Sequence, residues 1–419
     1  HGSEVPASVG ISLNVQGAVG GSTASNEALE WLQGGGHDPK KNGFTFQQAE
    51  LGLSASAQEN LSAEAILVAS EHGVELEEAF VVLSSLPGDT EVKAGYFLTE
   101  FGLQNASHPH EWNWIDQSVI NTRMFGGEGT RGAGARASLI MPAPWYSEVQ
   151  LTLQDASGDF MTSFLTGTQG HSHDHGEEAG HDHAEEHEHE HAEERGDDDA
   201  AQALEEAGLE SGIGGWPVVG RETDDFEDLV YAARWINRFY PTPEWMTQIG
   251  VSGMQGPNFT GDGASTWLAG IDWVLQWQSP EATSGRPFFR LESEWIYRDL
   301  EAAEFALELE DGDHLHEPGT TLTDWGFYIQ ALYGFDQAWS AGLRFDYASG
   351  DGESLGGREQ DPYRADRIRI SPLLTYQLQE SARIKLQYNY DQTDALEDQE
   401  AHSVWVALDV SFGAHNHSH

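Results

Sequence analysis

A repeated alternation of apolar and polar residues constrains this chain more than any other feature. The segment 384–390 places Ile, Leu, Tyr and Tyr at every second position, and 267–277, 289–297 and 339–347 follow the same pattern. Successive side chains of a β-strand point to opposite faces, so a period of two predicts strands with one apolar face. Helical spacing of apolar residues is hard to find. The sequence therefore predicts an all-β fold.

The alternation predicts sixteen strands, and the connections between them differ systematically in length. The strands are expected at 9–20, 43–57, 60–69, 74–84, 90–97, 131–140, 145–155, 226–238, 243–254, 264–277, 286–298, 323–334, 338–349, 367–378, 381–391 and 400–412. Short connections are expected at 58–59, 86–89, 142–144, 240–242, 334–336 and 380, and long ones at 21–42, 98–130, 156–225, 299–322 and 350–366. Short turns at one end and long loops at the other are the plan of a bacterial outer-membrane barrel. A soluble β-sandwich has no reason to sort its connections in this way.

The distribution of apolar residues favours a barrel that spans a membrane. No run approaches the roughly 18 consecutive apolar residues of a membrane helix, whereas barrel strands are short and only half apolar. Aromatic residues end many of the expected strands, as interfacial girdles do: Trp245, Trp267, Trp277, Trp325, Trp339, Tyr347 and Tyr390. The last strand has one apolar face that ends in an aromatic residue and resembles the assembly signal of outer-membrane barrels: Val404, Val406, Leu408, Val410 and Phe412.

We therefore expect residues 1–419 to form a single 16-stranded antiparallel transmembrane β-barrel in the lipid of the bacterial outer membrane. Its turns should be short and periplasmic, and its long loops extracellular, including a constriction loop at 98–130 and a loop at 156–225. A His-containing tail, 413–419, follows the last strand, and an even number of strands places both termini in the periplasm. The chain starts at His1 rather than at methionine, so we expect that a signal peptide has been removed.

The charge of the chain argues against nucleic acid as a partner. The sequence has 70 acidic and 20 basic residues, for a formal net charge of -50, which repels nucleic acid and attracts cations. A high-salt habitat would select the same acidity, and this alternative stays open. Cysteine is absent, so disulfides and thiolate metal sites are excluded. Because no nucleotide-binding glycine pattern, nucleophile elbow or H-E-x-x-H motif occurs, we do not expect an enzyme.

The loop at 156–225 contains a segment, 171–199, that is dense in histidine and carboxylate residues. So few of its side chains are apolar that we expect a disordered, solvated segment. Imidazole and carboxylate suit zinc and other divalent transition metals, and content alone does not choose among zinc, copper, nickel and cobalt. The expected ligands are His171, His173, His175, His181, His183, His187, His189 and His191. The alternative is an acidic solvating spacer.

Two shorter H-x-H pairs also have the spacing of metal ligands. His108 and His110 fall in the expected constriction loop, and His314 and His316 follow a run of acidic residues. An extended backbone puts both imidazoles of such a pair on one face, so that one segment supplies two ligands. Incidental polar loops are an equally good explanation. The acidic glycine loops at 261–263 and 350–353 could bind calcium, although ordinary turns explain them well and EF-hand spacing is missing.

The face opposite the lipid is expected to carry many of the few basic residues, together with acids. These expected pore-lining residues are Arg234, Arg238, Arg290, Glu292, Glu294, Arg344, Asp346, Arg367, Arg369 and Lys385, with Asp391 beside them. They can pair with acids of the infolded loops and brace the barrel. Alternatively, an arginine track beside an acidic loop gives a transverse field that orients polar solutes. The net ion selectivity stays open.

Three neighbouring segments carry a resemblance to a known family. The acidic strand 74–80, the segment 92–97 and the residues Glu100-Phe101-Gly102-Leu103 follow the pattern "acidic strand, turn, K-x-G-x-F-x-x-x-F-G-L" and resemble the phosphate-selective porin superfamily. The resemblance implies a sixteen-stranded barrel, commonly a homotrimer, whose third extracellular loop folds inward and narrows the pore. The Gly-Ala-His start of the tail is similar to a branch described as zinc-regulated. The acidic loops depart from the basic loops that a phosphate pore needs, so phosphate is not the expected substrate.

These observations favour a porin-like channel that captures and passively admits divalent metal ions, zinc above all, through its histidine-rich extracellular loop. One alternative is a general or anion-selective porin in which that loop is only a surface metal buffer. Another is a surface-binding barrel that conducts nothing.

Overall fold

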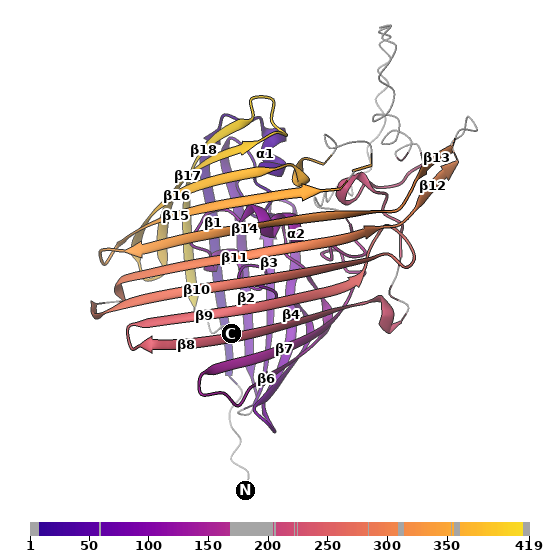
Figure 1. Cartoon of the computed structure of the whole chain (residues 1–419). Coiled ribbons are helices and arrows are strands. Elements are labelled where there is room, and N and C mark those ends of the chain that lie inside the picture. The colour runs from indigo at the N-terminus through magenta and orange to yellow at the C-terminus, as the bar shows by residue number, and fades with distance from the viewer. Residues whose placement is uncertain are drawn as a thin grey trace.

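The computed structural model describes residues 8–57, 60–167, 204, 207–221, 223, 225–283, 285–308, 314–352, 354–355 and 361–413. Sixteen strands close an antiparallel barrel in which each strand pairs with its neighbours in the chain and β1 pairs with β18 (Figure 1). The barrel strands are β1 (Ser8–Ser22), β2 (Gly43–Ser56), β3 (Leu61–Ser70), β4 (Gly73–Leu86), β5 (Thr90–Leu98), β6 (Arg131–Ile140), β7 (Tyr146–Asp155), β8 (Leu229–Thr242), β9 (Trp245–Pro257), β10 (Ser265–Thr283), β11 (Arg286–Ala302), β14 (Thr320–Gly334), β15 (Trp339–Asp351), β16 (Arg367–Gln379), β17 (Ala382–Thr393) and β18 (Glu400–Gly413). The predicted fold class is confirmed.

Short helices and one extra hairpin lie in the connections. The hairpin joins β12 (Phe305–Glu308) to β13 (His314–Glu317) and stands apart from the barrel sheet. The helices are α1 (Asn26–Leu32), α2 (Val119–Phe125) and the 3-10 turns η1 (Pro109–Glu111), η2 (Ile213–Gly215), η3 (Phe226–Asp228) and η5 (Pro362–Arg364). In the part of the chain that the structure describes, no helix has the length and apolar character needed to cross a bilayer.

The alternating residues face the two sides of the wall as the sequence predicted, polar side chains inward and apolar side chains outward. In β17, Lys385, Gln387 and Asn389 are buried inside the barrel, and Leu386 between them is 44% exposed on the outside. An apolar outer face is stable only against lipid, and a closed barrel leaves no strand edge unpaired in it. The chain is thus a barrel of the bacterial outer membrane.

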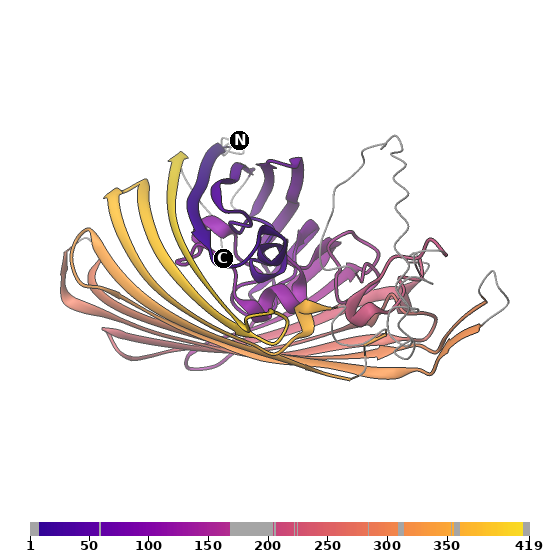
Figure 2. The same ribbon diagram turned by 90° about the horizontal axis from the view of Figure 1, so that it is seen from above.

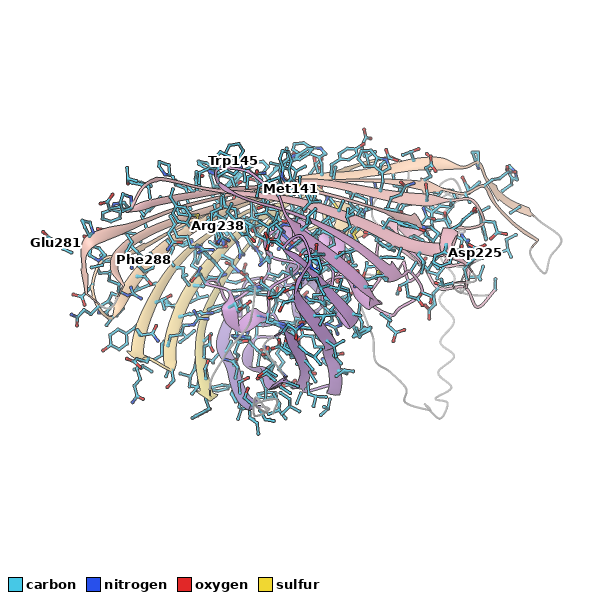
Figure 3. All side chains as sticks on the ribbon, turned by 90° about the horizontal axis from the view of Figure 1, so that it is seen from below. Met141, Trp145, Asp225, Arg238, Glu281 and Phe288 are labelled. Carbon is cyan, nitrogen blue, oxygen red and sulfur yellow. The ribbon has the colours of Figure 1, made fainter. Side chains whose placement is uncertain are left out.

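The two ends of the barrel differ in their connections. We call the end at which β1 begins and β18 ends the turn end, because β10 and β11, for example, are joined there across 284–285. The opposite end, here the loop end, carries the connections 99–130 and 156–228 but also the two-residue turn 71–72. Figure 3 shows Glu281 and Phe288 toward one end of the wall and Asp225 toward the other.

Most predicted strand bounds lie within a few residues of the observed ones, and the largest difference is at β10, which ends at Thr283 rather than at 277. β11 ends at Ala302 rather than at 298, because it continues to pair with β14 up to the partners Ala302 and Thr320. This extension lies at the loop end and contains Asp299 and Glu301. The backbone ladder therefore continues beyond the apolar band, where alternation no longer marks it.

Candidate functional site: an infolded loop in the barrel lumen

The connection 99–130 leaves the loop end and folds into the barrel (Figure 2), where hydrogen bonds join it to several strands of the inner wall. On one side, Gln47 of β2 donates to the Ile115 carbonyl at 3.2 Å. On another, the indole of Trp114 donates to the Ser371 carbonyl of β16 at 3.0 Å. The segment 98–130 predicted as a constriction loop thus lies in the lumen, and we call residues 99–130 the infolded loop.

An apolar core holds the second half of the infolded loop. The helix α2 starts after Ser118 and ends at Gly126, whose φ of 75° suits a residue without Cβ. All seven residues of α2 are buried. Its apolar side chains pack against inward-facing residues of the strands: Val230, Ala232, Met254, Leu268, Ile296, Tyr328 and Ala348. Sequence reasoning missed this apolar part of the wall, since it expected polar side chains at lumen positions.

Asp116 is the main polar anchor of the infolded loop. Its carboxylate is fully buried and accepts hydrogen bonds from Arg344 at 2.6 Å, Arg369 at 2.9 Å, Gln387 at 2.7 Å and Asn389 at 2.6 Å. Burial favours the neutral carboxyl, but the two guanidinium groups outweigh it and lower the pKa of Asp116 to about 2. Arg344 and Arg369 therefore hold the infolded loop against the wall.

A cluster of two histidines and three glutamates joins the infolded loop to the wall formed by β2 and β4. His108 places Nδ1 3.1 Å from Glu77 and Nε2 3.0 Å from Glu78, and His110 places Nδ1 2.9 Å from Glu50. The two imidazoles stack with their centroids 5.8 Å apart. Burial lowers the pKa of His108, but Glu77 and its neighbours outweigh this effect and raise it well above its ordinary value. We call these five residues the inner cluster.

A β-bulge explains how two consecutive glutamates reach the same cluster. Ile66 of β3 pairs with Glu78, and the next residue, Leu67, pairs with Leu76, which leaves Glu77 as the extra residue. Such an insertion breaks the alternation and turns two neighbouring side chains toward one face. Both carboxylates are consequently buried in the lumen. Strict alternation would have pointed one of them at the lipid.

The inner cluster has the composition of a site for a divalent transition metal. One ligand atom each from Glu50, Glu77 and His108 can be chosen so that all three lie within 4.8 Å of one another. Imidazole nitrogen with carboxylate oxygen is a common ligand set for zinc, and three protein ligands leave a position open for water or exchange. A bound metal would need the imidazole without its proton, so metal and proton compete here.

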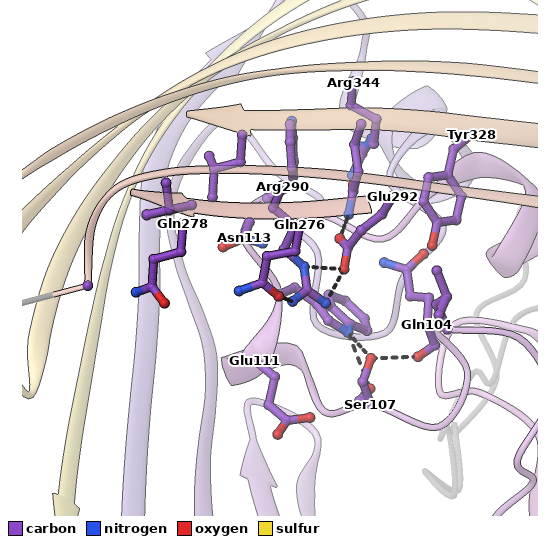
Figure 4. Close-up of a pocket in the computed structure, with 17 residues that line it drawn as sticks. Gln104, Ser107, Glu111, Asn113, Gln276, Gln278, Arg290, Glu292, Tyr328 and Arg344 are labelled. Carbon is purple, nitrogen blue, oxygen red and sulfur yellow. Dashed lines mark hydrogen bonds and ion pairs between the residues drawn. The ribbon is translucent and has the colours of Figure 1, made fainter. Parts of the chain in front are cut away.

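A polar cavity of about 540 Å³ lies on the other side of the same loop segment (Figure 4). The infolded loop contributes Ser107, Glu111 and Trp112, and β10, β11 and β14 contribute residues near the turn end. Arg290 donates to Glu292 at 2.7 Å, and Gln330 donates to the other oxygen of Glu292 at 2.5 Å. The cavity is therefore lined by amides and a paired charge. None of the five residues of the inner cluster lines this cavity.

Of the predicted metal ligands, the structure describes two groups, and they lie in separate parts of the molecule. His108 and His110 come together in the inner cluster, whereas the histidines from His171 to His191 lie outside the described residues. His316 lies on the β12–β13 hairpin, is exposed, and pairs with Glu304 at 2.9 Å. For His314, the structure describes only the backbone, in β13. In the predicted calcium loops, Asp262 pairs with Arg221 at 3.4 Å, and Glu353 is not among the described residues.

The residues predicted to line the pore come from β8, β11, β15, β16 and β17, and most of them have ionic or polar partners. Arg234 pairs with Asp272 at 3.1 Å, and Arg238 donates to Gln248 at 3.0 Å. The remaining pairings follow the same plan: Arg344 with Asp346, Arg367 and Arg369 with Asp391, Glu294 with Asn121, and Lys385 with the Trp112 carbonyl. Sequence reasoning missed Glu50, Glu77 and Glu78, although the acidic strand 74–80 had been noticed.

Comparisons with known proteins agree with the fold. No protein-family model matches the chain. An uncharacterized protein of Aquifex aeolicus is 34% identical over 142 residues, a match that spans 33% of this chain and only 29% of that relative. The outer membrane channel DcaP of Acinetobacter baumannii has a similar structure, with a TM-score of 0.54 and 11% identity over 98% of this chain and 99% of its own. The trimer form of OmpT, an outer membrane protein of Vibrio cholerae, has a TM-score of 0.50 and 7% identity, with 97% and 99% of the two chains covered.

These likenesses concern the fold. The resemblance to the phosphate-selective superfamily and its zinc-regulated branch stays a prediction, as does the expectation that the chain is not an enzyme. The chain is a sixteen-stranded outer-membrane barrel with a porin-like fold and a loop folded into its lumen.

Proposed function

We propose that this protein is a porin-like channel that gathers divalent metal ions, zinc above all, at the cell surface and lets them diffuse inward. The observation that carries the proposal is the inner cluster, because it brings imidazoles of the infolded loop against carboxylates of the wall, inside the barrel. The histidine-rich segment 171–199 belongs to the connection at the loop end and would raise the local metal concentration there. Trimerisation belongs to the same proposal and rests on the family resemblance.

The charges of the inner cluster suit transient binding. Glu50, Glu77 and Glu78 bring three negative charges to a site with almost no exposure to water, and a divalent ion offsets most of them when His108 is neutral. The ion must displace the proton that bridges these groups, which keeps its affinity moderate. Segment 107–114 has this cluster on one side and the 540 Å³ cavity on the other. A rearrangement of this segment would pass an ion toward the turn end.

A general porin is the second candidate, and the cavity favours it. Amides and the Arg290–Glu292 pair suit any small polar solute, with no preference for a metal. Reversal potentials across a potassium chloride gradient separate the two candidates. Cation preference supports the metal channel, and anion preference contradicts it.

Zinc entry into liposomes that carry the purified protein tests the proposal. At scarce zinc, we expect zinc to enter more slowly through the His108→Ala variant than through the intact chain. His316, on the exposed hairpin, provides the control: zinc should enter through His316→Ala as fast as through the intact chain. Deletion of 171–191 should also slow entry at scarce zinc but not at abundant zinc. Equal entry for the intact chain and His108→Ala would contradict a role of the inner cluster.

A further inference from the structure

A second group of side chains that could bind a metal lies closer to the loop end than the inner cluster does. It contains His37, from the connection after α1, Glu75, near the start of β4, and Glu128, at the end of the infolded loop. One ligand atom each from these three residues can be chosen so that all lie within 4.8 Å of one another. None of the three was among the ligands predicted from the sequence. We call them the outer cluster.

The imidazole of His37 is held by Gln47 on one side and by Glu128 on the other. Its Nδ1 lies 3.3 Å from the Gln47 carbonyl, and the Gln47 amide donates back to the His37 carbonyl at 2.8 Å. The opposite nitrogen, Nε2, forms an ion pair with Glu128 Oε2 at 3.1 Å. Both of these atoms are ligand types that zinc accepts, so a divalent ion could replace the proton between them.

Backbone contacts place the two loops that carry these atoms. The amide of Gly36 donates to the Gly127 carbonyl at 2.9 Å, which ties the residue before His37 to the residue before Glu128. A Cβ on Gly36 would lie 1.6 Å from Glu128 Oε1. The absence of a side chain at Gly36 therefore lets the Glu128 carboxylate occupy its position beside His37.

A small cavity connects the two clusters. It has a volume of about 20 Å³ and is lined by His37 and Glu128 of the outer cluster and by Glu77 of the inner cluster. This volume is enough for a single water molecule or a bare ion. An ion released from the outer cluster would thus meet Glu77 next.

The charge of the outer cluster fits a divalent cation. Glu75 and Glu128 carry two negative charges, and Arg131 carries one positive charge, with Nη2 2.9 Å from Glu75 and Nη1 4.0 Å from Glu128. Arg131 Nη1 also lies 3.7 Å from Glu77 of the inner cluster. The two clusters together thus have five carboxylates and one guanidinium, a net charge that two divalent ions beside neutral histidines would balance. Without metal a proton takes this place: burial lowers the pKa of His37, but Glu128 outweighs it and raises that pKa to about 9.

We infer that His37, Glu75 and Glu128 form an entry site for a divalent metal ion of the zinc type. Glu75 is 30% exposed and Glu128 21% exposed, whereas the side chains of the inner cluster are at most 8% exposed. An ion that arrives at the loop end therefore reaches the outer cluster first. Its role as the first step of permeation rests on the proposed function, but ion binding at these three residues does not.

Anomalous diffraction at the zinc edge, from crystals of the full chain grown with zinc chloride, tests the inference directly. We expect a zinc peak among His37, Glu75 and Glu128 in the intact protein and no such peak in His37→Gln. Equilibrium dialysis should show one zinc ion fewer per chain for His37→Gln and for Glu128→Gln, and no change for the control His316→Gln. Matching circular dichroism spectra would show that the variants keep the barrel.

The outcomes separate this inference from the proposed channel. No peak among the three residues, or undiminished zinc binding by both variants, would overturn the outer site even if liposomes carrying the protein still admit zinc. A peak at the outer cluster in a protein that admits no zinc would leave the site in place and overturn the channel.

Discussion

Replacement of Asp116 by alanine tests whether the infolded loop is held in place by buried charge. Removing one member of a buried ion pair costs about 3–5 kcal/mol, because the partner is left without compensation. Arg344 and Arg369 keep Asp346 and Asp391 as second partners, so we expect the lower end, about 3 kcal/mol. The cost falls on the infolded loop, since the strand ladder itself is untouched.

Amide hydrogen exchange measures this cost locally. The Ile115 amide donates to Gln387 at 2.8 Å and should report opening of the infolded loop. A loss of about 3 kcal/mol corresponds to roughly 100-fold faster exchange, since each 1.4 kcal/mol is a factor of ten. Asp262→Asn, at a carboxylate that is 99% exposed, should leave exchange unchanged. Exchange in Asp116→Ala within about threefold of the intact protein would refute the reasoning.

Three further predictions follow from other parts of the structure. The folded state lowers the pKa of Asp116 from 3.8 to about 2, so its contribution to stability is complete above pH 4 and is lost as the pH falls toward 2. The protection factor of the Ile115 amide, its intrinsic exchange rate at each pH divided by its observed rate, should therefore fall over that interval and stay constant from about pH 5 to 7. Gly36→Ala should displace the Glu128 carboxylate, so the zinc anomalous peak should weaken at the outer cluster and stay unchanged at the inner cluster. Full zinc occupancy at the outer cluster would argue against the close approach of Glu128 to Gly36. Leu343→Arg, 54% exposed midway between the girdle residues Trp339 and Tyr347, should cost about 2–4 kcal/mol of unfolding free energy in lipid vesicles, and a cost below about 1 kcal/mol would mean that this face is not in lipid.

The strands were predictable because lipid outside and mostly polar groups inside impose a period of two on long stretches of them. The prediction gave β6 its observed bounds, 131–140, since apolar alternation and pairing end together there. β11 was predicted too short because its last residues pair beyond the lipid, where only the backbone ladder defines the strand. The helices α1 and α2 have seven residues each, too few for a helical period to stand out against the alternation.

The candidate site was predictable only in part, because its residues are distant in sequence. The spacing of His108 and His110 marked them as ligands, and the structure brings them together with carboxylates from β2 and β4. Glu77 could not be assigned to the lumen, since the bulge that turns it inward depends on the pairing of β3 with β4. His37 likewise could not be predicted as a metal ligand, because only the fold of the infolded loop brings Glu128 beside it.

Single-channel recording in planar bilayers tests the central claim, that divalent metal binds inside the pore, most directly. The potassium current through the intact protein should be reduced by micromolar zinc in a voltage-dependent way, because an ion bound at His108 would lie within the transmembrane field. The zinc block should be lost in His108→Ala and retained in His316→Ala. A potassium current that zinc leaves unchanged in the intact protein would contradict the account.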